Sequence, residues 1–260
     1  MDKRLTVVIP TYNEAANLPQ LAAALLALSI RGTELSVLVV DDASPDGTGR
    51  LAEELAGRQP DRFHVLHRAS KKGLASACIE GFARALETGA DLVAQMDADL
   101  SHDPNILPLM VGRIENADVV IGSRYIANGS VDPEWSRHRK FLSKLANRSF
   151  VPLLLGLETH DSTSGYRLWR RETLLAINPA LNVSSNGYAF QVEMLYLTER
   201  LDCRIVEIPI HFPERRAGTS KMNLPVKLSA IYDILTMPWR HLQNGASAGT
   251  SEGGPGAISK

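Results

Sequence analysis

Two carboxylates that lie two residues apart, Asp97 and Asp99, are the side chains of this sequence best suited to carry chemistry. They follow the apolar residues Leu92, Val93 and Met96, which predict a buried strand that ends at the acids. Two carboxylates at a strand end repel each other, and a hard divalent cation with oxygen ligands, Mg²⁺ or Mn²⁺, is the usual partner between them. A cation held by few protein ligands completes its shell with phosphate oxygens. The pattern therefore predicts a metal and phosphate site, with a solvated turn as the alternative.

Strand-like and helix-like segments alternate around these acids. Residues 35–40 form an apolar run broken only by Ser36, which is typical of a strand buried on both faces. The alternation predicts an α/β fold, a Rossmann-like, doubly wound and mainly parallel sheet with right-handed crossovers and flanking helices. The expected strands are residues 5–9, 35–40, 63–66, the segment up to Met96, and 118–121; the expected helices are residues 15–28, one from 48, 74–87 and one that ends near 115.

Charged and polar residues gather where these strands end. Ligands of such sheets bind outside the carboxyl ends of the strands. Acids and one arginine are therefore expected along a single edge of the sheet. In chain order, the residues at this edge are Pro10, Tyr12 and Glu14, then Asp41 and Asp42, then Asp97 and Asp99, and finally Arg124.

Two other nucleotide-binding patterns are excluded by the sequence. Gly47 and Gly49 form a GxG, but the third glycine of a dinucleotide fingerprint is missing and the motif follows the second strand. We interpret this segment as a plain turn. The sequence contains no GxxxxGK[ST], so it has no P-loop.

The composition places further limits on function. A chain of 260 residues with 44% hydrophobic and 22% charged residues is ordinary for a globular protein with a sizeable core. The net charge of −1 gives no overall attraction for nucleic acid. Cys78 and Cys203 lack metal-ligand spacing, which favours free thiols in a reducing compartment. The apolar run at the N-terminus is too short for a signal peptide, so we expect a cytoplasmic location. No run of about 18 apolar residues occurs, so we expect no helix that spans a bilayer.

The second half of the chain has a different character. Residues 136–149 predict a basic, amphipathic helix that leads into the apolar segment 150–157. This pattern fits a membrane interface and fits a surface helix with a core-facing side equally well. Residues 211–223 form a basic, glycine-bearing loop of the kind that closes over a phosphate, with a solvated loop as the alternative. A last helix is expected over 224–242, and the composition of residues 244–260 predicts a disordered tail.

Six motifs occur in an order that resembles one family. They are VVIPTYNE, VVDDASPDGT, DADLSHDP, VIGSRY, DSTSGYR and HFPERRAGTSK, and together they span about residues 5–223. The chain resembles the inverting GT-A glycosyltransferases of family 2, and specifically the polyprenyl-phosphate (dolichyl-phosphate) mannose synthases. The resemblance implies one catalytic GT-A domain over residues 1–243, with a nucleotide-sugar-binding half (1–125) and an acceptor-side half of helices and loops (126–243).

The resemblance also implies a role for each matching residue. Asp99, Arg124 and Arg139 would be the catalytic group. Arg124, Arg139 and Ser143 would bind the acceptor phosphate. Asp97, Asp99 and Ser101 would hold the Mg²⁺ or Mn²⁺ ion, although many relatives carry Gln at the position of Ser101. The nucleotide sugar would contact Pro10, Tyr12, Glu14, Val40, Asp42, Asp97, Ala98, Asp99, Arg124, Arg215 and Lys221.

The implied reaction transfers mannose from GDP-mannose to a polyprenyl phosphate with inversion, on the cytoplasmic face of a membrane. A membrane-anchoring partner protein would be compatible with this location. The main alternative is a polyprenyl-phosphate glucose synthase that uses UDP-glucose. A polysaccharide-extending transferase fits less well because the sequence has no QxxRW-type motif. A nucleotide-sugar-binding module without catalysis is disfavoured by the intact acids, Asp97 and Asp99.

Overall fold

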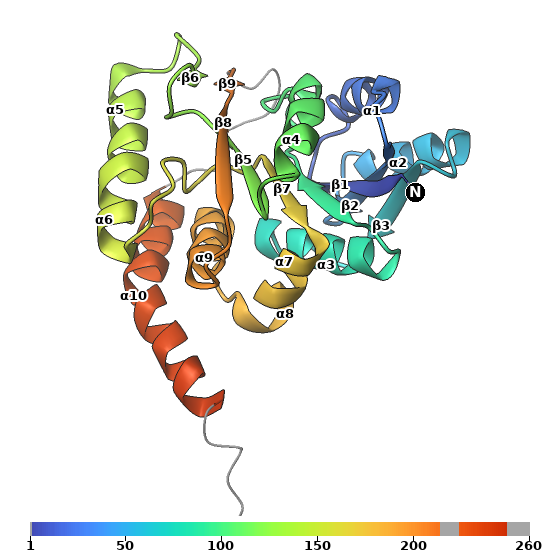
Figure 1. Ribbon diagram of the computed structural model, residues 1–260. Helices are drawn as coiled ribbons and strands as arrows, with labels where there is room; N and C mark the ends of the chain where they lie inside the picture. Colours follow the sequence, from blue (N-terminus) through green and yellow to red (C-terminus); the bar gives the residue numbers. More distant parts are fainter. Residues whose placement is uncertain (1, 214–223, 249–260) are drawn as a thin grey trace, which may run out of the picture.

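Seven strands form one central sheet in the computed structural model of the chain, which describes residues 2–213 and 224–248 (Figure 1). The strand order is β3-β2-β1-β4-β7-β5-β8. The mainly parallel, doubly wound sheet expected from the sequence is confirmed, with β3 and β8 at its two edges. The strands are β1 (Lys3–Thr11), β2 (Thr33–Asp41), β3 (Phe63–His67), β4 (Leu92–Gln95), β5 (Val119–Ser123), β7 (Arg167–Arg170) and β8 (Ile205–Pro209).

One strand of the sheet runs against the others. β7 lies between β4 and β5 and pairs with both in antiparallel register, with Arg167 opposite Gln95 on one side and Ile121 on the other. The periodicity of the sequence did not reveal this strand, because it is only four residues long. Its direction has a simple cause. The chain leaves β5 at the carboxyl edge of the sheet and returns to the same edge, so the returning strand must run the opposite way.

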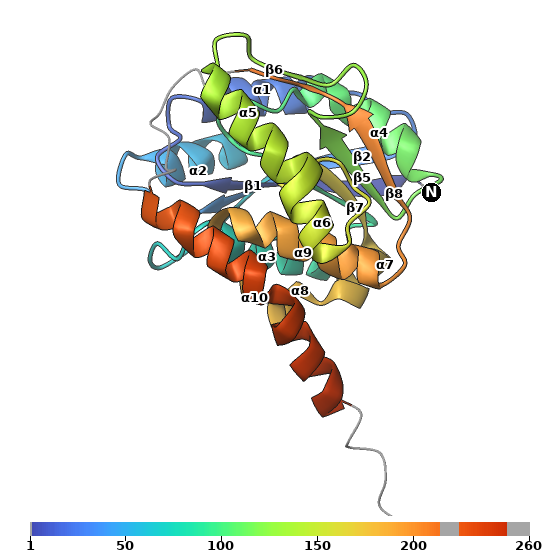
Figure 2. The same ribbon diagram turned by 90° about the vertical axis from the view of Figure 1, so that its left-hand side faces the viewer.

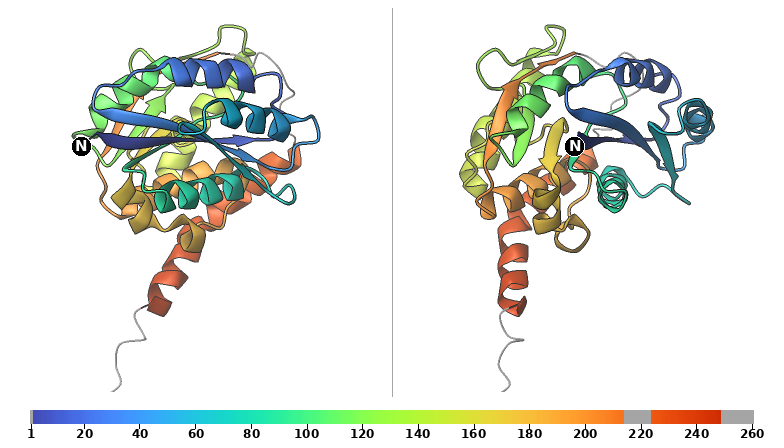
Figure 3. Two further views of the ribbon diagram at one scale, coloured as in Figure 1. Left: turned by 90° about the vertical axis from the view of Figure 1, so that its right-hand side faces the viewer. Right: turned by 45° about the vertical axis from the view of Figure 1, so that its right-hand side comes forward.

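Two helical layers enclose the sheet (Figure 3). Successive residues of a strand point to opposite faces, so Val7 belongs to one core and Val8 to the other. Helices α1 (Leu18–Ala27), α2 (Thr48–Arg58) and α4 (Leu107–Ile114), the last preceded by the 3₁₀ turn η1 (Pro104–Ile106), cover the first face. Helices α3 (Leu74–Glu87), α7 (Arg171–Ile177) and α9 (Gly187–Arg200) cover the second, beside the short α8 (Pro179–Asn182).

Helix α3 approaches the sheet closely at Gly81. A Cβ atom added there would lie 2.4 Å from Cγ1 of Val8 on β1. We therefore expect Gly81→Ala to lower the free energy of unfolding by about 1–3 kcal/mol, since the packed core must move to admit the methyl group. Gly57→Ala on α2, where a Cβ would meet nothing within 4 Å, should instead raise stability by about 0.5–1 kcal/mol. Urea denaturation of both variants measures the difference, and equal effects would contradict this account of the packing.

The C-terminal half adds helices at the carboxyl edge of the sheet. The basic helix expected at 136–149 is present as α5 (Arg137–Leu145), which continues through the π-helix η2 (Ala146–Phe150) into α6 (Val151–Leu155). Two short strands, β6 (Ser130–Val131) and β9 (His211–Phe212), pair with each other in parallel as a separate two-stranded sheet. No helix in the described ranges is long and apolar enough to cross a bilayer.

The last helix is longer than the sequence predicted. α10 (Leu224–Ala248) continues past residue 242, so residues 244–248 are helical and the prediction of a tail from 244 was wrong for them. Extending an existing helix needs no new nucleation, which lets it continue through residues of low helical propensity. Residues 249–260 lie outside the described part of the chain.

Candidate active site

The acidic pair Asp97 and Asp99 lies just beyond β4, at the carboxyl edge of the sheet. Asp99 is 5% exposed, Ala98 is buried and Asp97 is half-buried. The Ser101 N–H lies 3.1 Å from Oδ1 of Asp99, and the Ser101 hydroxyl donates to the same oxygen. Between them Leu100 has a φ of 63°, a left-handed conformation that is strained for this residue type. Two donors of Ser101, its backbone N–H and its hydroxyl, thus hold the Asp99 carboxylate in place.

His102 fixes the backbone of the same motif. Its ring is buried, and its Nδ1 accepts the Asp97 N–H at 3.0 Å, so the ring proton belongs on Nε2. Burial lowers the pKa of His102 although Asp97 and Asp99 act to raise it, which keeps the ring neutral and able to accept. The ring also stacks on Tyr166 at 5.0 Å between centroids. His102 therefore supports the Asp97 backbone from within the protein.

The ends of β1 and β2 lie side by side at this edge. Pro10 is directly opposite Val40 in the parallel register. Val40 is completely buried in the second core, so only its backbone can face the edge. The Nζ atom of Lys71 lies 3.7 Å from the centroid of the Tyr12 ring. This cation lies over one of the residues expected to line the nucleotide pocket.

Asp42 is tied into the structure by several donors. Its carboxylate accepts from the buried Arg68 guanidinium and from the N–H groups of Lys72 at 2.9 Å and Gly73 at 2.7 Å. These bonds fix the turn before α3 against the end of β2. The carboxylate is 5% exposed, so any contact it makes with a ribose is limited to a small part of its surface.

The turn that follows β2 is joined to the turn that follows β1. Gly47 has a φ of 89°, which confirms the turn expected in place of a dinucleotide fingerprint. The Glu14 N–H donates to Oγ1 of Thr48 at 2.9 Å, and the Asn17 amide donates to Glu14 at 2.9 Å. Glu14 therefore has a defined position at the edge of the sheet.

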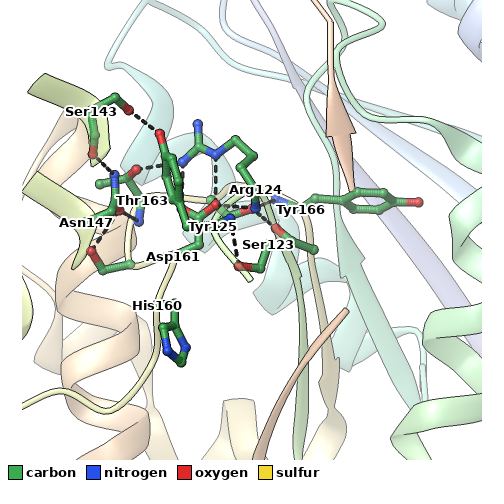
Figure 4. Close-up of polar contacts among 12 residues, drawn as sticks. Ser123, Arg124, Tyr125, Ser143, Asn147, His160, Asp161, Thr163 and Tyr166 are labelled. Carbon is green, nitrogen blue, oxygen red and sulfur yellow. Dashed lines mark hydrogen bonds and ion pairs between the residues drawn. The ribbon is translucent and has the colours of Figure 1, made fainter. Parts of the chain in front are cut away.

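Arg124, directly after β5, is held by a carboxylate that was not selected from the sequence (Figure 4). Its Nε donates to Asp161 at 2.8 Å and its Nη2 at 2.6 Å, and the Arg124 N–H donates to the same side chain at 2.9 Å. The Asp161 side chain is 0% exposed and the Arg124 side chain 9% exposed. The guanidinium also lies 5.2 Å from the ring centroids of both Tyr125 and Phe212. Its orientation is therefore fixed before any ligand binds.

The segment that supplies Asp161, residues 161–165, is anchored by two further side chains. The fully buried Arg167 donates to the carbonyl groups of Ser162 and Ser164, each at 2.9 Å. Asn147 of the π-helix accepts from the Ser162 hydroxyl and the Thr163 N–H, each at 3.0 Å. Burial lowers the pKa of Arg167 to about 10, so it remains charged near neutrality. In the sequence, the only sign that residues 161–165 and Arg167 contribute to the site was that they belong to the DSTSGYR motif.

The same loop reaches the acids of β4. A Cβ atom placed on Gly165 would lie 3.5 Å from Oδ1 of Asp97 and 3.5 Å from Nε2 of Gln191. These are ordinary van der Waals distances, so the loop lies close to the Asp97 carboxylate at Gly165. One short segment thus contacts both the acidic pair and, through Asp161, the arginine of β5.

The expected acceptor residues are described only in part. Ser143 on α5 lies close to the end of β5, with its Oγ 2.5 Å from the hydroxyl of Tyr125. Arg139 lies one helical turn before Ser143 on α5, and its side chain is not described. Arg215 and Lys221 lie outside the described residues. The structure thus brings Asp97, Asp99, Ser101, Arg124 and Ser143 to one edge of the sheet.

Comparison with known proteins decides the family. The family model for glycosyl transferase family 2 matches residues 6–177, more than half of the chain. The chain belongs to this family. The resemblance drawn from its motifs is confirmed, and the chain is a glycosyltransferase.

Three relatives that are named as mannose-transferring enzymes align with most of this glycosyltransferase. The chain is 44% identical over 222 residues to the polyprenol monophosphomannose synthase of Mycolicibacterium smegmatis, covering 85% of this chain and 82% of that one. It is 45% identical over 231 residues to the undecaprenyl-phosphate mannosyltransferase of Micrococcus luteus, covering 89% and 92%. The dolichol-phosphate mannosyltransferase of Pyrococcus furiosus is 35% identical over 223 residues, covering 84% of this chain and 59% of that one.

Solved structures support the GT-A fold. The glucosyl-3-phosphoglycerate synthase of Mycobacterium tuberculosis, solved with Mn²⁺, UDP and glucosyl-3-phosphoglycerate, has a TM-score of 0.62 at 19% identity and covers 92% of this chain and 79% of that one. A structure of the same enzyme with Mn²⁺, UDP and phosphoglyceric acid has a TM-score of 0.64, also at 19% identity, covering 92% and 78%. At this identity the likeness concerns the fold alone.

Proposed function

We propose that this glycosyltransferase moves mannose from GDP-mannose to a polyprenyl phosphate, with inversion, and releases GDP. The observation that carries the proposal is that residues 161–165 lie near Asp97 at Gly165 and hold Arg124 through Asp161, with Ser143 bonded to the neighbouring Tyr125. Acids suit a metal-bound diphosphate, and an arginine beside a hydroxyl suits a second phosphate. The names of the relatives at 44% and 45% identity agree with this acceptor and this sugar.

The oxygen donors at the end of β4 fit a Mg²⁺ or Mn²⁺ ion. Asp97, Asp99 and Ser101 offer only oxygen atoms, which hard cations prefer. Within the described ranges no cluster of three or more His, Cys, Asp or Glu residues could hold a metal. Two carboxylates and a hydroxyl would leave positions in the shell of the ion for diphosphate oxygens and water. A bound ion would neutralise the diphosphate and stabilise its departure.

The reaction needs no general base. The attacking group is a phosphate oxygen of the lipid, which is already an anion near neutral pH. It forms a bond to the anomeric carbon while the bond from that carbon to GDP breaks, and the electron pair leaves with GDP. The protein must therefore hold two anions together in line. In this proposal Arg124, with Arg139 and Ser143, positions the acceptor, and Arg215 and Lys221 act on the donor phosphates.

A donor panel tests this assignment. Purified protein would receive radiolabelled GDP-mannose, GDP-glucose or UDP-glucose with a polyprenyl phosphate and Mg²⁺ or Mn²⁺. We expect label in the lipid fraction only with GDP-mannose, and none when the metal is removed by a chelator. Transfer from UDP-glucose alone would replace the proposal with the glucose synthase. Transfer from none of the three would refute it.

We further propose that helices α5 and α6 rest on the membrane that contains the acceptor. They lie end to end along one side of the molecule beside α10 (Figure 2). Basic residues flank their apolar side chains, namely Arg137, Lys140, Lys144 and Arg148. The exposed apolar side chains of this surface are Phe141, Leu142, Leu145, Phe150, Leu153 and Leu154. Basic groups beside exposed apolar ones favour an anionic lipid surface. A separate membrane-anchoring protein is compatible with this arrangement.

We expect the protein to co-sediment with vesicles that contain anionic lipid. Leu153, which is 89% exposed, should enter the bilayer, so Leu153→Asp should weaken binding at least about tenfold through lost apolar burial and added charge. Leu181→Asp is the matched control, because Leu181 is 78% exposed on the separate helix α8. Equal loss in both variants, or no binding by the unaltered protein, would contradict the proposed membrane surface.

A further inference from the structure

The hydroxyl of Tyr125 lies at the proposed acceptor site, where no role has been assigned to it. Tyr125 follows Arg124 at the end of β5, and its hydroxyl oxygen lies 2.5 Å from Oγ of Ser143 on α5 (Figure 4). The contact joins two residues that are 18 positions apart in the chain. It also brings a phenol to the position where Ser143 is expected to meet a phosphate.

The hydrogen bond between the two hydroxyls leaves one proton unused. Each hydroxyl carries one hydrogen, and only one of the two can lie between Tyr125 and Ser143. Among the described residues, neither hydroxyl has a second hydrogen-bond partner in the structure. Both side chains are half-buried, so the spare O–H has access to an incoming group. The pair is thus a donor without an acceptor in the described part of the chain.

The surroundings favour an anion at this point. The Arg124 guanidinium lies 5.2 Å from the Tyr125 ring, which fixes the ring beside a positive charge. Asp161 balances much of that charge through its two-pronged contact with Arg124. A phosphate that approaches Arg124 therefore gains from additional neutral donors, and the Tyr125–Ser143 pair is one.

We propose that Tyr125 is a direct ligand of the acceptor's phosphate monoester. Its hydroxyl and that of Ser143 share one hydrogen, and the remaining O–H donates to a phosphate oxygen that also faces Arg124. This proposal rests on the proposed function, since it takes a lipid monophosphate as the ligand. The competing explanation is that Tyr125 only positions Ser143, in which case its effect must disappear when the Ser143 hydroxyl is removed.

Binding of a short-chain alkyl monophosphate, followed by titration calorimetry, separates these explanations. Tyr125→Phe should weaken binding about tenfold, as expected for a hydrogen bond to a charged group. In a Ser143→Ala background, Tyr125→Phe should weaken it further, by at least about threefold. Tyr196→Phe is the matched control, because its hydroxyl accepts from Arg200 within α9, and it should bind like the unaltered protein. Unchanged binding in Tyr125→Phe, or no additional loss in the double variant, would overturn the proposal.

Two further arms identify the recognised group and separate this proposal from the proposed function. Inorganic phosphate should displace the alkyl phosphate; failure to compete would show that only the alkyl chain is bound and would overturn the proposal. In the mannosyl-transfer assay, Tyr125→Phe should raise the KM for polyprenyl phosphate about tenfold and leave that for GDP-mannose unchanged. Transfer with an unchanged acceptor KM would refute the role of Tyr125. Tyr125-dependent binding without any transfer would refute the proposed function and support the ligand role.

Discussion

Asp99→Asn should reduce mannosyl transfer by about a hundredfold to a thousandfold, which is the range seen when one preorganised electrostatic group is removed from an active site. The substitution keeps the shape of the side chain and the oxygen that accepts from Ser101, but it removes the negative charge. Without that charge the site loses an anionic ligand for the divalent ion and with it the neutralisation of the diphosphate. Initial rates with GDP-mannose and polyprenyl phosphate measure the loss.

Binding measurements show whether the loss has the proposed cause. Titration of Mn²⁺ in the presence of GDP should give a clear binding signal with the unaltered protein and none with Asp99→Asn. Asp61→Asn, a change to an exposed aspartate in the loop before β3, should behave like the unaltered protein in both assays. Retention of full activity by Asp99→Asn would remove the metal role from the acidic pair.

Asp161→Asn should have the second largest effect. Asp161 is the buried partner of Arg124 and receives its Nε, its Nη2 and its backbone N–H. An asparagine offers one oxygen in place of two, and its amide group would face the donors of Arg124. Breaking a buried ion pair at one partner costs about 3–5 kcal/mol. We expect lower stability in urea denaturation. We also expect kcat/KM to fall about a hundredfold, because Arg124 would no longer be held in place.

A double-variant cycle shows whether Asp161 acts through Arg124. In an Arg124→Ala background, Asp161→Asn should cause little further loss of activity, because the group that Asp161 positions is already absent. Glu193→Gln is the control for burial alone. Glu193 is a fully buried carboxylate on α9 that accepts from Ser185 and His241, so its substitution should lower stability without raising the acceptor KM. Additive losses from Arg124 and Asp161 would contradict the positioning role.

The first half of the fold could be predicted from the sequence because its signals are local. Continuous apolar runs indicate strands buried on both faces, and the helix expected over 74–87 is α3 (Leu74–Glu87) without change. Since the carboxyl ends of parallel strands share one edge, the order of strands and helices along the chain was enough to place Asp42, Asp97 and Arg124 together.

The contacts around Arg124 and Tyr125 could not be predicted in the same way. The bond between Arg124 and Asp161 joins residues 37 positions apart, and that between Tyr125 and Ser143 links a strand end to a helix. The first depends on the four-residue strand β7, which follows residues 161–165 and lies between β4 and β5. A segment so short carries no periodicity that could indicate its neighbours or its direction.

The amino-acid sequence by itself determined the alternating elements, the family, and the acids and arginine at the carboxyl edge, because each is encoded in neighbouring residues. Only the tertiary structure decided which buried groups hold those residues. Asp161 and Asn147 act through hydrogen bonds between residues far apart in the chain, which come together where residues 161–165 lead into β7. His102 bonds to Asp97 only five residues away, but the Tyr166 ring that stacks on it comes from the same distant segment. Such contacts depend on packing across the whole domain, and no local pattern in the chain specifies them.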